Sequence, residues 1–290
     1  MEEKDKLGYE FGQLAIVSTP IGNLGDLSPR ACKSLEEVDI IACEDTRNTR
    51  KLLSLSNIKT KARLLSYNDH NGPKIRPKLI SQLLAGKNIA LVCDAGTPLI
   101  SDPGFKLVSS CHRANIKVTA VPGPCAVIAS MTISGLPSDK FLFAGFVPQN
   151  KNSAMKTFRE FSNLSVTSIW FESPRRVTST LDRMADIFGD RDAVVTREIT
   201  KVFEDYKHGT IQELAQHYKT APPPKGEIVI LLAGAPTSSN LVSDDELISM
   251  LRSEMKQNSL KNSVNNVKKI SGKSRKIIYD LAIKLAKSEE

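Results

Sequence analysis

Polar and acidic residues follow the apolar runs of this 290-residue chain directly. The segment 91–104 reads LVCDAGTPLISDPG, so one apolar run ends on Asp94, and a second carboxylate, Asp102, follows it. Gly96 would let a ligand come close to the backbone, while Thr97 and Ser101 offer hydroxyl groups for hydrogen bonds. The segment is therefore typical of a site for a small ligand that carries hydroxyl groups and positive charge. S-adenosylmethionine fits this description, as would a nucleoside or an amino acid.

Other kinds of site fit the sequence less well. No glycine-rich phosphate loop is present, and a carboxylate at position 94 would repel a phosphate. No G-x-S-x-G elbow marks a catalytic serine, and the four histidines are too scattered for a zinc motif. Magnesium stays open, because several carboxylates lie near strand ends, but none has metal-motif spacing and we predict no metal. These carboxylates are Glu44, Asp45, Asp94, Glu172 and Glu198.

Short apolar runs alternate with helix-like stretches over the first 235 residues, which predicts an α/β fold. Runs such as DIIAC and EIVILL are nearly continuous, so we expect strands buried on both faces and largely parallel sheets. Ligands of such sheets bind beyond the carboxyl ends of the strands, where the polar segments lie. The expected strands are 14–18, 39–43, 63–66, 89–93, 117–121, 141–146, 167–171, 193–196 and 227–232.

A small or polar residue before a proline marks four expected helix starts, because proline costs little at the first helical position. In this interpretation Asp102 mainly caps a helix that begins at Pro103, and Asp94 alone faces the ligand. Two further segments, 210–213 and 243–246, fit the capping box. The four proline pairs are Ser28-Pro29, Asp102-Pro103, Gly123-Pro124 and Ser173-Pro174.

The length predicts two domains, since typical domains hold about 100 to 200 residues. The turn-rich run GLPSDK separates two α/β blocks, and AGAPTSSN is typical of a linker. Three short amphipathic segments follow the linker and predict a small helical module of helix-turn-helix type. We therefore expect a tail at 1–13, α/β domains at 14–135 and 136–236, and a basic helical module at 242–290.

The net charge of +8 belongs mainly to the C-terminal segment, because residues 255–290 alone carry +6. A basic module on a near-neutral body suggests a nucleic-acid partner, although a solvated helical face would look the same. No apolar stretch approaches the roughly 18 residues of a membrane span, and the N-terminus has no apolar signal segment. The five cysteines lack C-x-x-C spacing. We expect a cytoplasmic protein with reduced thiols and no membrane partner.

Nine segments, in order along the chain, closely resemble those of the family of ribosomal RNA small subunit methyltransferase I, within the tetrapyrrole methylase-like superfamily. The likeness covers residues 14–234 and extends to the helical module. The segments are STPIGNLGDLSPRA, EDTRNTRKLL, SYNDHN, DAGTPLISDPG, VPGPCAVIASM, GFVP, FESPRR, REITKVFE and KGEIVILL.

The resemblance implies two α/β domains with S-adenosylmethionine in the cleft between them, and a homodimer. It also implies methyl transfer to the ribose 2′-oxygen of a cytidine in the decoding region of 16S ribosomal RNA, free or within the 30S subunit. The implied cofactor site draws on both domains. It comprises Pro20, Asp94, Ala95, Gly96, Thr97, Ile100, Ser101, Pro122, Gly123, Ser173, Lys225 and Gly226.

Three rival functions stay open. A methylase of a small tetrapyrrole precursor would share the fold and cofactor, but it would not need the basic module. A nucleic-acid regulator built around the helical tail would not need the cofactor segment. A magnesium-dependent phosphohydrolase would need the metal for activity.

Methyl transfer to a ribose requires that the hydroxyl group be aligned with the methyl group and deprotonated. We expect Glu44 or Asp45 to be the base, because both open the helix that follows strand 39–43. The alternative is that Asp45 caps this helix and Glu44 complements its dipole. The family often has two histidines in the SYNDHN segment. Asn68 replaces the first of them here and His70 remains as a third candidate.

Several cations lie where they could contact RNA phosphates. Arg47, Arg50 and Lys51 fall on one side of the expected helix, at i, i+3 and i+4, although a solvated face would look the same. A second pair follows another strand, and the C-terminal module holds five further candidates. They are Arg175, Arg176, Lys268, Lys269, Lys273, Arg275 and Lys276.

Overall fold

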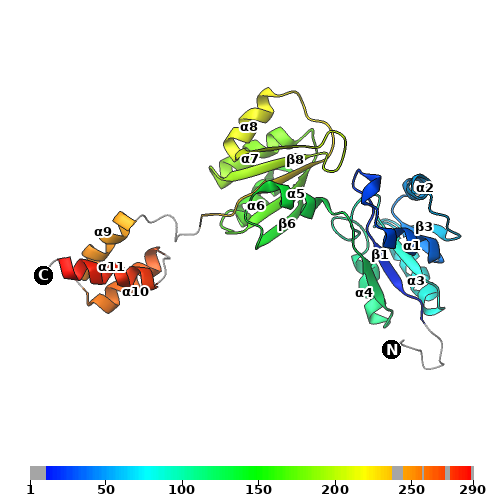
Figure 1. The fold of residues 1–290 in the computed structure, drawn as a ribbon, viewed down its shortest axis with the longest axis horizontal. Coiled ribbons are helices and arrows are strands. Elements are labelled where there is room, and N and C mark those ends of the chain that lie inside the picture. The colour runs from blue at the N-terminus through cyan, green and yellow to red at the C-terminus, as the bar shows by residue number, and fades with distance from the viewer. Residues whose placement is uncertain (1–10, 237–243, 257, 272–274, 289–290) are drawn as a thin grey trace.

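The computed structural model describes residues 11–236, 244–256, 258–271 and 275–288, which form two β-sheets flanked by helices and a C-terminal group of helices (Figure 1). The first sheet has the order β3-β2-β4-β1-β5, and all its pairings are parallel. Its strands are β1 (Leu14–Val17), β2 (Ile40–Cys43), β3 (Arg63–Ser66), β4 (Ile89–Val92) and β5 (Val118–Val121).

Helices cover both faces of the first sheet. Ile41 and Cys43 of β2 enter a core with α1 and α2, while Ile40 and Ala42 enter another with α3 and α4. This division follows from the alternation of side chains along a strand, and it explains why the central strands β2 and β4 are apolar throughout. The helices are α1 (Pro29–Glu37), α2 (Thr46–Leu55), α3 (Gly72–Leu84) and α4 (Phe105–Arg113), with a short 3₁₀ helix, η1 (Leu24–Asp26).

The second sheet has the order β6-β7-β10-β8-β9 and is mixed. Only β6 and β7 run parallel, and the other three pairings are antiparallel, so the prediction of largely parallel sheets is wrong for this one. A return strand, β10, inserts between β7 and β8, and its direction cannot be read from an apolar run. The strands are β6 (Phe141–Phe146), β7 (Thr167–Glu172), β8 (Asp192–Arg197), β9 (Asp205–Thr210) and β10 (Ile228–Leu232).

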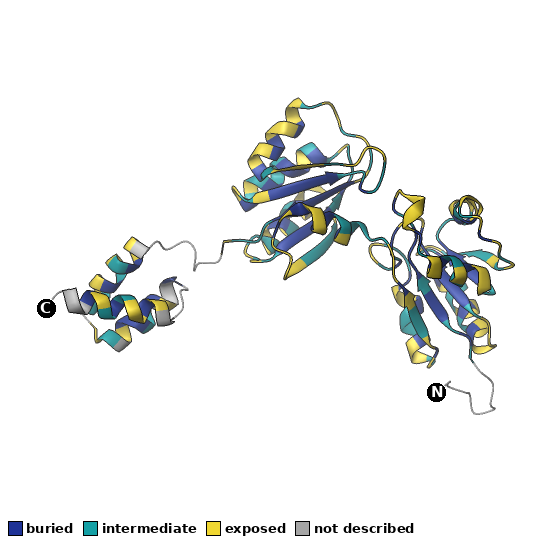
Figure 2. Cartoon of the chain, viewed as in Figure 1, coloured by how far each residue is buried: buried dark blue, intermediate teal, exposed yellow. Residues whose placement is uncertain are grey.

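Three helices cover one face of the second sheet and a fourth covers the other. The first face holds α6 (Lys151–Phe161), α7 (Val177–Phe188) and α8 (Ile211–Thr220) around the buried Trp170. The other face holds α5 (Ala126–Ser134), whose side chains pack with strand residues in a separate core. Figure 2 shows that buried residues line the strands of both sheets, while exposed residues lie on the outer helix faces.

Helix α5 follows a strand of the first sheet but packs on the second. Val127 and Met131 share a core with Ile169, and the Ser130 and Thr196 hydroxyl groups lie 2.9 Å apart in a hydrogen bond. The domain boundary predicted after residue 135 would assign this helix to the first domain. That boundary stays a prediction, and the packing of α5 favours an earlier one.

Of the four proline pairs, Ser28-Pro29 alone marks a helix start. Ser28 does cap α1 by accepting a hydrogen bond from the Ala31 amide, and the capping box at Thr210 is present. The other three pairs are wrong as helix starts, because the chain continues as a loop after each proline. The second predicted capping box begins at Ser243, which lies outside the described residues. The observed N-caps are Gly104 for α4, Cys125 for α5 and Arg176 for α7.

The C-terminal prediction of three helices is confirmed. They are α9 (Asp244–Met255), α10 (Leu260–Ser271) and α11 (Arg275–Ser288). Leu251, Val264 and Ile278, one from each helix, meet in a shared apolar core. None of the described helices combines the length and the apolar character that a bilayer crossing requires.

Candidate active site

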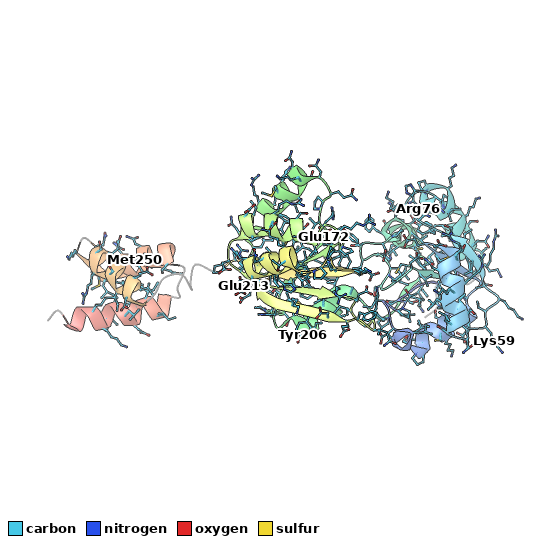
Figure 3. The ribbon with its side chains drawn as sticks, turned by 90° about the horizontal axis from the view of Figure 1, so that it is seen from above. Lys59, Arg76, Glu172, Tyr206, Glu213 and Met250 are labelled. Atoms are coloured by element: carbon cyan, nitrogen blue, oxygen red, sulfur yellow. The ribbon has the colours of Figure 1, made fainter. Side chains whose placement is uncertain are left out.

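A cleft of about 320 Å³ opens between the carboxyl-end loops of the first sheet and the facing edge of the second. Its volume falls in the range of about 300 to 1,000 Å³ that is usual for small-ligand sites. Figure 3 marks Glu172 among the side chains of the second sheet. The lining residues are Ile21, Asp94, Ala95, Gly96, Thr97, Ile100, Ser101, Asp102, Cys125, Ala126, Phe146, Phe171, Glu172, Pro174, Gly226, Glu227, Ile228 and Val229.

The structure places seven of the predicted cofactor residues in this lining and five beside it. Those in the lining are the six between positions 94 and 101, together with Gly226. Pro20, Ser173 and Lys225 each adjoin a lining residue. Pro122 and Gly123 precede Pro124, whose carbonyl group accepts a hydrogen bond from Thr97.

The loop that follows β4 is fixed to the end of β1. Thr97 donates to the Pro124 carbonyl at 3.0 Å and lies 2.9 Å from the Ser18 hydroxyl. Gly96 exchanges two main-chain hydrogen bonds with Thr19 and has a φ of +87°, a conformation that favours glycine. Ser101 also has a positive φ. The main-chain groups of this loop are therefore held in place before any ligand arrives.

Asp94 is joined to the start of α2 through both of its carboxylate oxygens. One oxygen accepts from the Asp45 amide at 3.2 Å, and the other accepts from the Asn48 side chain at 2.7 Å. This position also favours a carboxylate because the N-terminus of a helix carries partial positive charge. The sequence does not predict this role of Asn48, since nothing in the local pattern says which strand the first turn of α2 faces.

The two acidic residues at the start of α2 have different environments. The Asp45 carboxylate accepts from the Arg47 amide at 2.8 Å and from its guanidinium at 2.6 Å. These bonds lower the pKa of Asp45 to about 2. Burial and the nearby charges of Asp94 and Asp102 instead raise the pKa of Glu44. The hydrogen bonds thus favour Asp45 as a cap, while Glu44, which is not among the residues that line the cleft, is the one of the two whose pKa is raised.

Asp102 lines the cleft as a second carboxylate, so the prediction that it caps a helix is wrong. Gly104 occupies the N-cap position of α4, and Asp102 lies in the lining instead. Burial raises the pKa of Asp102, and the charge of Asp94 raises it further. Both carboxylates of the opening segment therefore face the same space.

His70 is exposed on the loop between β3 and α3, and its amide donates to the Asn68 side chain at 3.1 Å. It does not belong to the residues that line the cleft. Across the residues that the structure describes, no group of three or more His, Cys, Asp or Glu side chains could hold a metal ion.

Glu172 is a buried anion whose oxygens are already engaged by the protein. It accepts from the Ser173 amide, from the Thr180 hydroxyl and from the Arg176 guanidinium, at 2.6 to 2.8 Å. Arg176 also donates to the Val147 carbonyl at 2.8 Å. Arg176 therefore neutralises Glu172, whereas Arg175 is exposed.

A charged cluster forms the rim of the cleft on the second sheet. Lys201 lies 2.8 Å from Glu198 and 3.4 Å from Glu227. Gly226 has a φ of +93°, and a Cβ there would overlap the Glu198 carboxylate. The Lys201 side chain also lies against Gly22, where a Cβ would overlap it. The rim thus contacts the loop that follows β1.

The predicted RNA-contact residues on α2 are exposed: Arg47 extends into solvent beside Asp45, and Arg50 and Lys51 lie further along the same helix. Lys268 of α10 is exposed as well. The side chains of Lys269, Arg275 and Lys276, and the whole of Lys273, lie outside the described part of the chain.

Comparisons with known proteins define the class. A family model described as Tetrapyrrole (Corrin/Porphyrin) Methylases matches residues 13–215. A solved uroporphyrin-III C-methyltransferase from Thermus thermophilus, in complex with S-adenosylhomocysteine, aligns with a TM-score of 0.53 and 18% identity over 76% of this chain and 97% of that one. A diphthine synthase aligns with a TM-score of 0.58 and 15% identity over 77% and 90%. At these identities the structures show the fold alone.

Closer relatives narrow the class. A ribosomal RNA small subunit methyltransferase I from Mesorhizobium japonicum is 41% identical over 94% of this chain and 92% of its own. Proteins of the same name from Vibrio cholerae and Rickettsia prowazekii are 42% and 46% identical, over 92% and 76% of this chain and 92% and 78% of their own. The chain belongs to the tetrapyrrole methylases and, among them, to the ribosomal RNA small subunit methyltransferase I family.

Proposed function

We propose that this protein uses S-adenosylmethionine to methylate 16S ribosomal RNA, at the ribose 2′-oxygen of a cytidine in the decoding region. One observation carries the proposal. The similarity to ribosomal RNA small subunit methyltransferase I extends over 94% of the chain at 41% identity, and so beyond the segment that matches the broader methylase family.

The chemistry of the cleft fits S-adenosylmethionine. Phe146, Phe171 and Val229 provide an apolar wall, which suits an adenine ring. Asp94 and Asp102 place negative charge where an ammonium group or a sulfonium would be stabilised. The main chain at Gly96 lines this space, and a Cβ at that position would lie 3.3 Å from Ile21, another lining residue. These residues would hold the cofactor.

S-adenosylmethionine supplies an electrophilic methyl group when bound. The chain must then position the ribose hydroxyl and accept its proton. We assign the proton to Glu44 rather than to Asp45 or His70. Its raised pKa brings it nearer to the working pH, whereas Asp45 is tied to Arg47. The hydrogen bonds from α2 hold Asp94 in the wall beside it.

The partners and architecture follow the same proposal. Arg47, Arg50, Lys51 and Arg175 contact RNA phosphates, and the C-terminal helices add a second contact. The chain forms a homodimer in the cytoplasm, with two α/β domains, as predicted. Exposed Ile128 on α5 and Phe141 on β6 border one hollow, and such an apolar surface supports self-association.

Two measurements test the proposed function. Calorimetry with S-adenosylmethionine, with and without EDTA, should give the same affinity in both conditions. Methyl transfer should then be followed on unmodified 30S subunits and on free 16S RNA, with the modified nucleotide mapped. Methylation of a tetrapyrrole precursor alone, or activity that disappears with EDTA, would contradict the proposal.

A further inference from the structure

The segment from Thr46 to Arg63 carries six cations and no carboxylate. It comprises α2, the loop that follows it and the first residue of β3. This excess is notable because residues 1–254 as a whole carry a net charge of only +2. The segment is therefore the more strongly basic of two such stretches in the N-terminal half; the other, residues 70–93, carries four cations and no carboxylate.

This part of the surface is hollowed. Arg50, Lys59 and Lys61 border a depression of about 560 Å³ beside α2. Leu53 and Ile58, both at least nine-tenths buried, contribute to its apolar floor. The depression lies at an edge of the first sheet, because β3 is the end strand in the order β3-β2-β4-β1-β5. Figure 3 labels Lys59 at the periphery of the molecule.

The protein itself leaves most of these cations without a counter-charge. Arg47 pairs with Asp45, but in the described ranges no carboxylate lies within 4.0 Å of Arg50, Lys59 or Lys61. Like charges that are close together repel each other and lower the stability of the fold. A polyanion that binds along this edge would remove the repulsion and gain the free energy of counterion release.

We propose that the edge formed by α2 and the start of β3 is a groove for a sugar-phosphate strand of the substrate RNA, with phosphates at Arg50, Lys59 and Lys61. The depression and the cleft lie at opposite ends of α2, because this helix begins at the residues bonded to Asp94 and runs about 15 Å from there toward Lys59, so a bound strand would follow α2 from one to the other. The identity of the strand as RNA rests on the proposed function. Alternating cations above an apolar floor suit a strand whose phosphates and bases point in different directions.

The test compares the double variant Lys59→Ala/Lys61→Ala with Lys106→Ala/Lys117→Ala. The control pair is also exposed, but it lies on α4 and just before β5, the opposite edge strand of the same sheet. The Kd for unmodified 16S RNA is measured over a series of salt concentrations. Two lost phosphate contacts should weaken binding about fivefold to tenfold and reduce the salt slope by about 1.5. The control should leave both values unchanged, and neither pair should alter S-adenosylmethionine affinity.

The outcomes separate this inference from the function on which it rests. If the wild type methylates ribosomal RNA and the Lys59/Lys61 variant keeps the wild-type Kd and salt slope, the groove is wrong and the function stands. If the wild type transfers no methyl group to ribosomal RNA, but its RNA affinity still depends on this pair, the function is wrong and the groove stands. A variant that loses self-association, or binding to an acidic protein, while keeping RNA affinity also overturns the groove.

Discussion

Asn48 donates a hydrogen bond of 2.7 Å to Asp94, and this bond joins the first turn of α2 to the wall of the cofactor cleft. The second oxygen of Asp94 accepts from the first residue before that helix. A displacement of α2 must therefore move or release the carboxylate. Because α2 also carries the proposed RNA contacts, binding of RNA and cofactor should be coupled through this pair.

Replacing Asn48 by alanine should weaken S-adenosylmethionine binding by up to about tenfold, because a hydrogen bond to a charged group contributes about 1.5 kcal/mol. Asn48→Asp should weaken it further, since two carboxylates would then face each other. Calorimetry measures both values, and Ser54→Ala, at the exposed far end of α2, is the matched control. Equal affinities for all of these proteins would remove Asn48 from the site.

Glu44→Gln should slow single-turnover methylation by about 10² to 10⁴, the usual contribution of a general base. Asp45→Asn keeps an effective N-cap and should stay within a few-fold of the wild-type rate. The wild-type rate should rise with pH through a pKa above the ordinary value for glutamate, and this limb should vanish in Glu44→Gln. A pH profile that is identical in both proteins would exclude Glu44.

The raised pKa of Glu44 also predicts a change in stability. The folded protein holds its proton more tightly than the unfolded chain, so ionisation of Glu44 costs stability as the pH rises above the unfolded value. Glu44→Gln should therefore raise the Tm of the protein without cofactor at neutral pH. The gain should disappear in acid, where Glu44 is protonated in both states.

Gly226→Ala should destabilise the protein and disturb the rim of the cleft. A Cβ would overlap the Glu198 carboxylate and displace it from Lys201. Gly189 is the matched control, because it also has a positive φ but has open space around its Cβ position. Urea denaturation should give a loss of about 1 kcal/mol for Gly189→Ala and a clearly larger loss for Gly226→Ala. Equal losses would mean that the overlap is relieved without cost.

Arg176→Ala should cost about 3 kcal/mol of folding free energy, because it leaves the fully buried Glu172 side chain without its counter-charge. Arg175→Ala should change stability by less than about 0.5 kcal/mol and should instead weaken RNA binding. Chemical denaturation and filter binding separate the two roles. If both variants lost RNA affinity at unchanged stability, Arg176 would belong to the RNA surface.

Removal of residues 242–290 should weaken RNA binding and flatten its salt dependence, because Lys268 and the neighbouring cations would be lost. Cofactor affinity should stay the same, since the cleft lining comes from residues 21–229. The shared apolar core of α9 to α11 indicates that the deletion removes a packed group of helices. A salt slope equal to that of the full chain would leave these helices without a role in binding.

The sequence predicts the buried strands well because burial on both faces leaves a local mark. All nine expected strands are present within one or two residues of the predicted bounds. The tenth strand, β9, is present in the structure but is not predicted from the sequence. It has the sequence DYKHGT and lies at the edge of the second sheet. Tyr206 and His208 are exposed there, so no apolar period marks the strand. Whether a strand lies at the edge of a sheet depends on how the other strands pair, and the sequence of that strand alone does not show this.

The cleft is harder to predict than the strands because its wall combines residues from distant segments. The polar loop after β4 is readable, since glycine, threonine and two carboxylates stand together in the sequence. The exposed Phe146 and the partly buried Phe171 are ordinary strand residues, and only the packing of one sheet against the other gives them a ligand-facing side. The prediction that Asp102 is a helix cap is wrong because the N-cap of α4 is Gly104. A proline that follows a polar residue fits a loop as well as a helix.

The packing of α5 decides where this chain could be recombined with that of a relative. A hybrid joined after residue 135 would combine α5 from one parent with the second sheet of the other. Met131 and Ser130 would then pack against strand residues of a different protein. A junction within 122–125 would keep the helix with its own sheet. The short loop before α5 is therefore the place at which such a junction would leave the core around α5 intact.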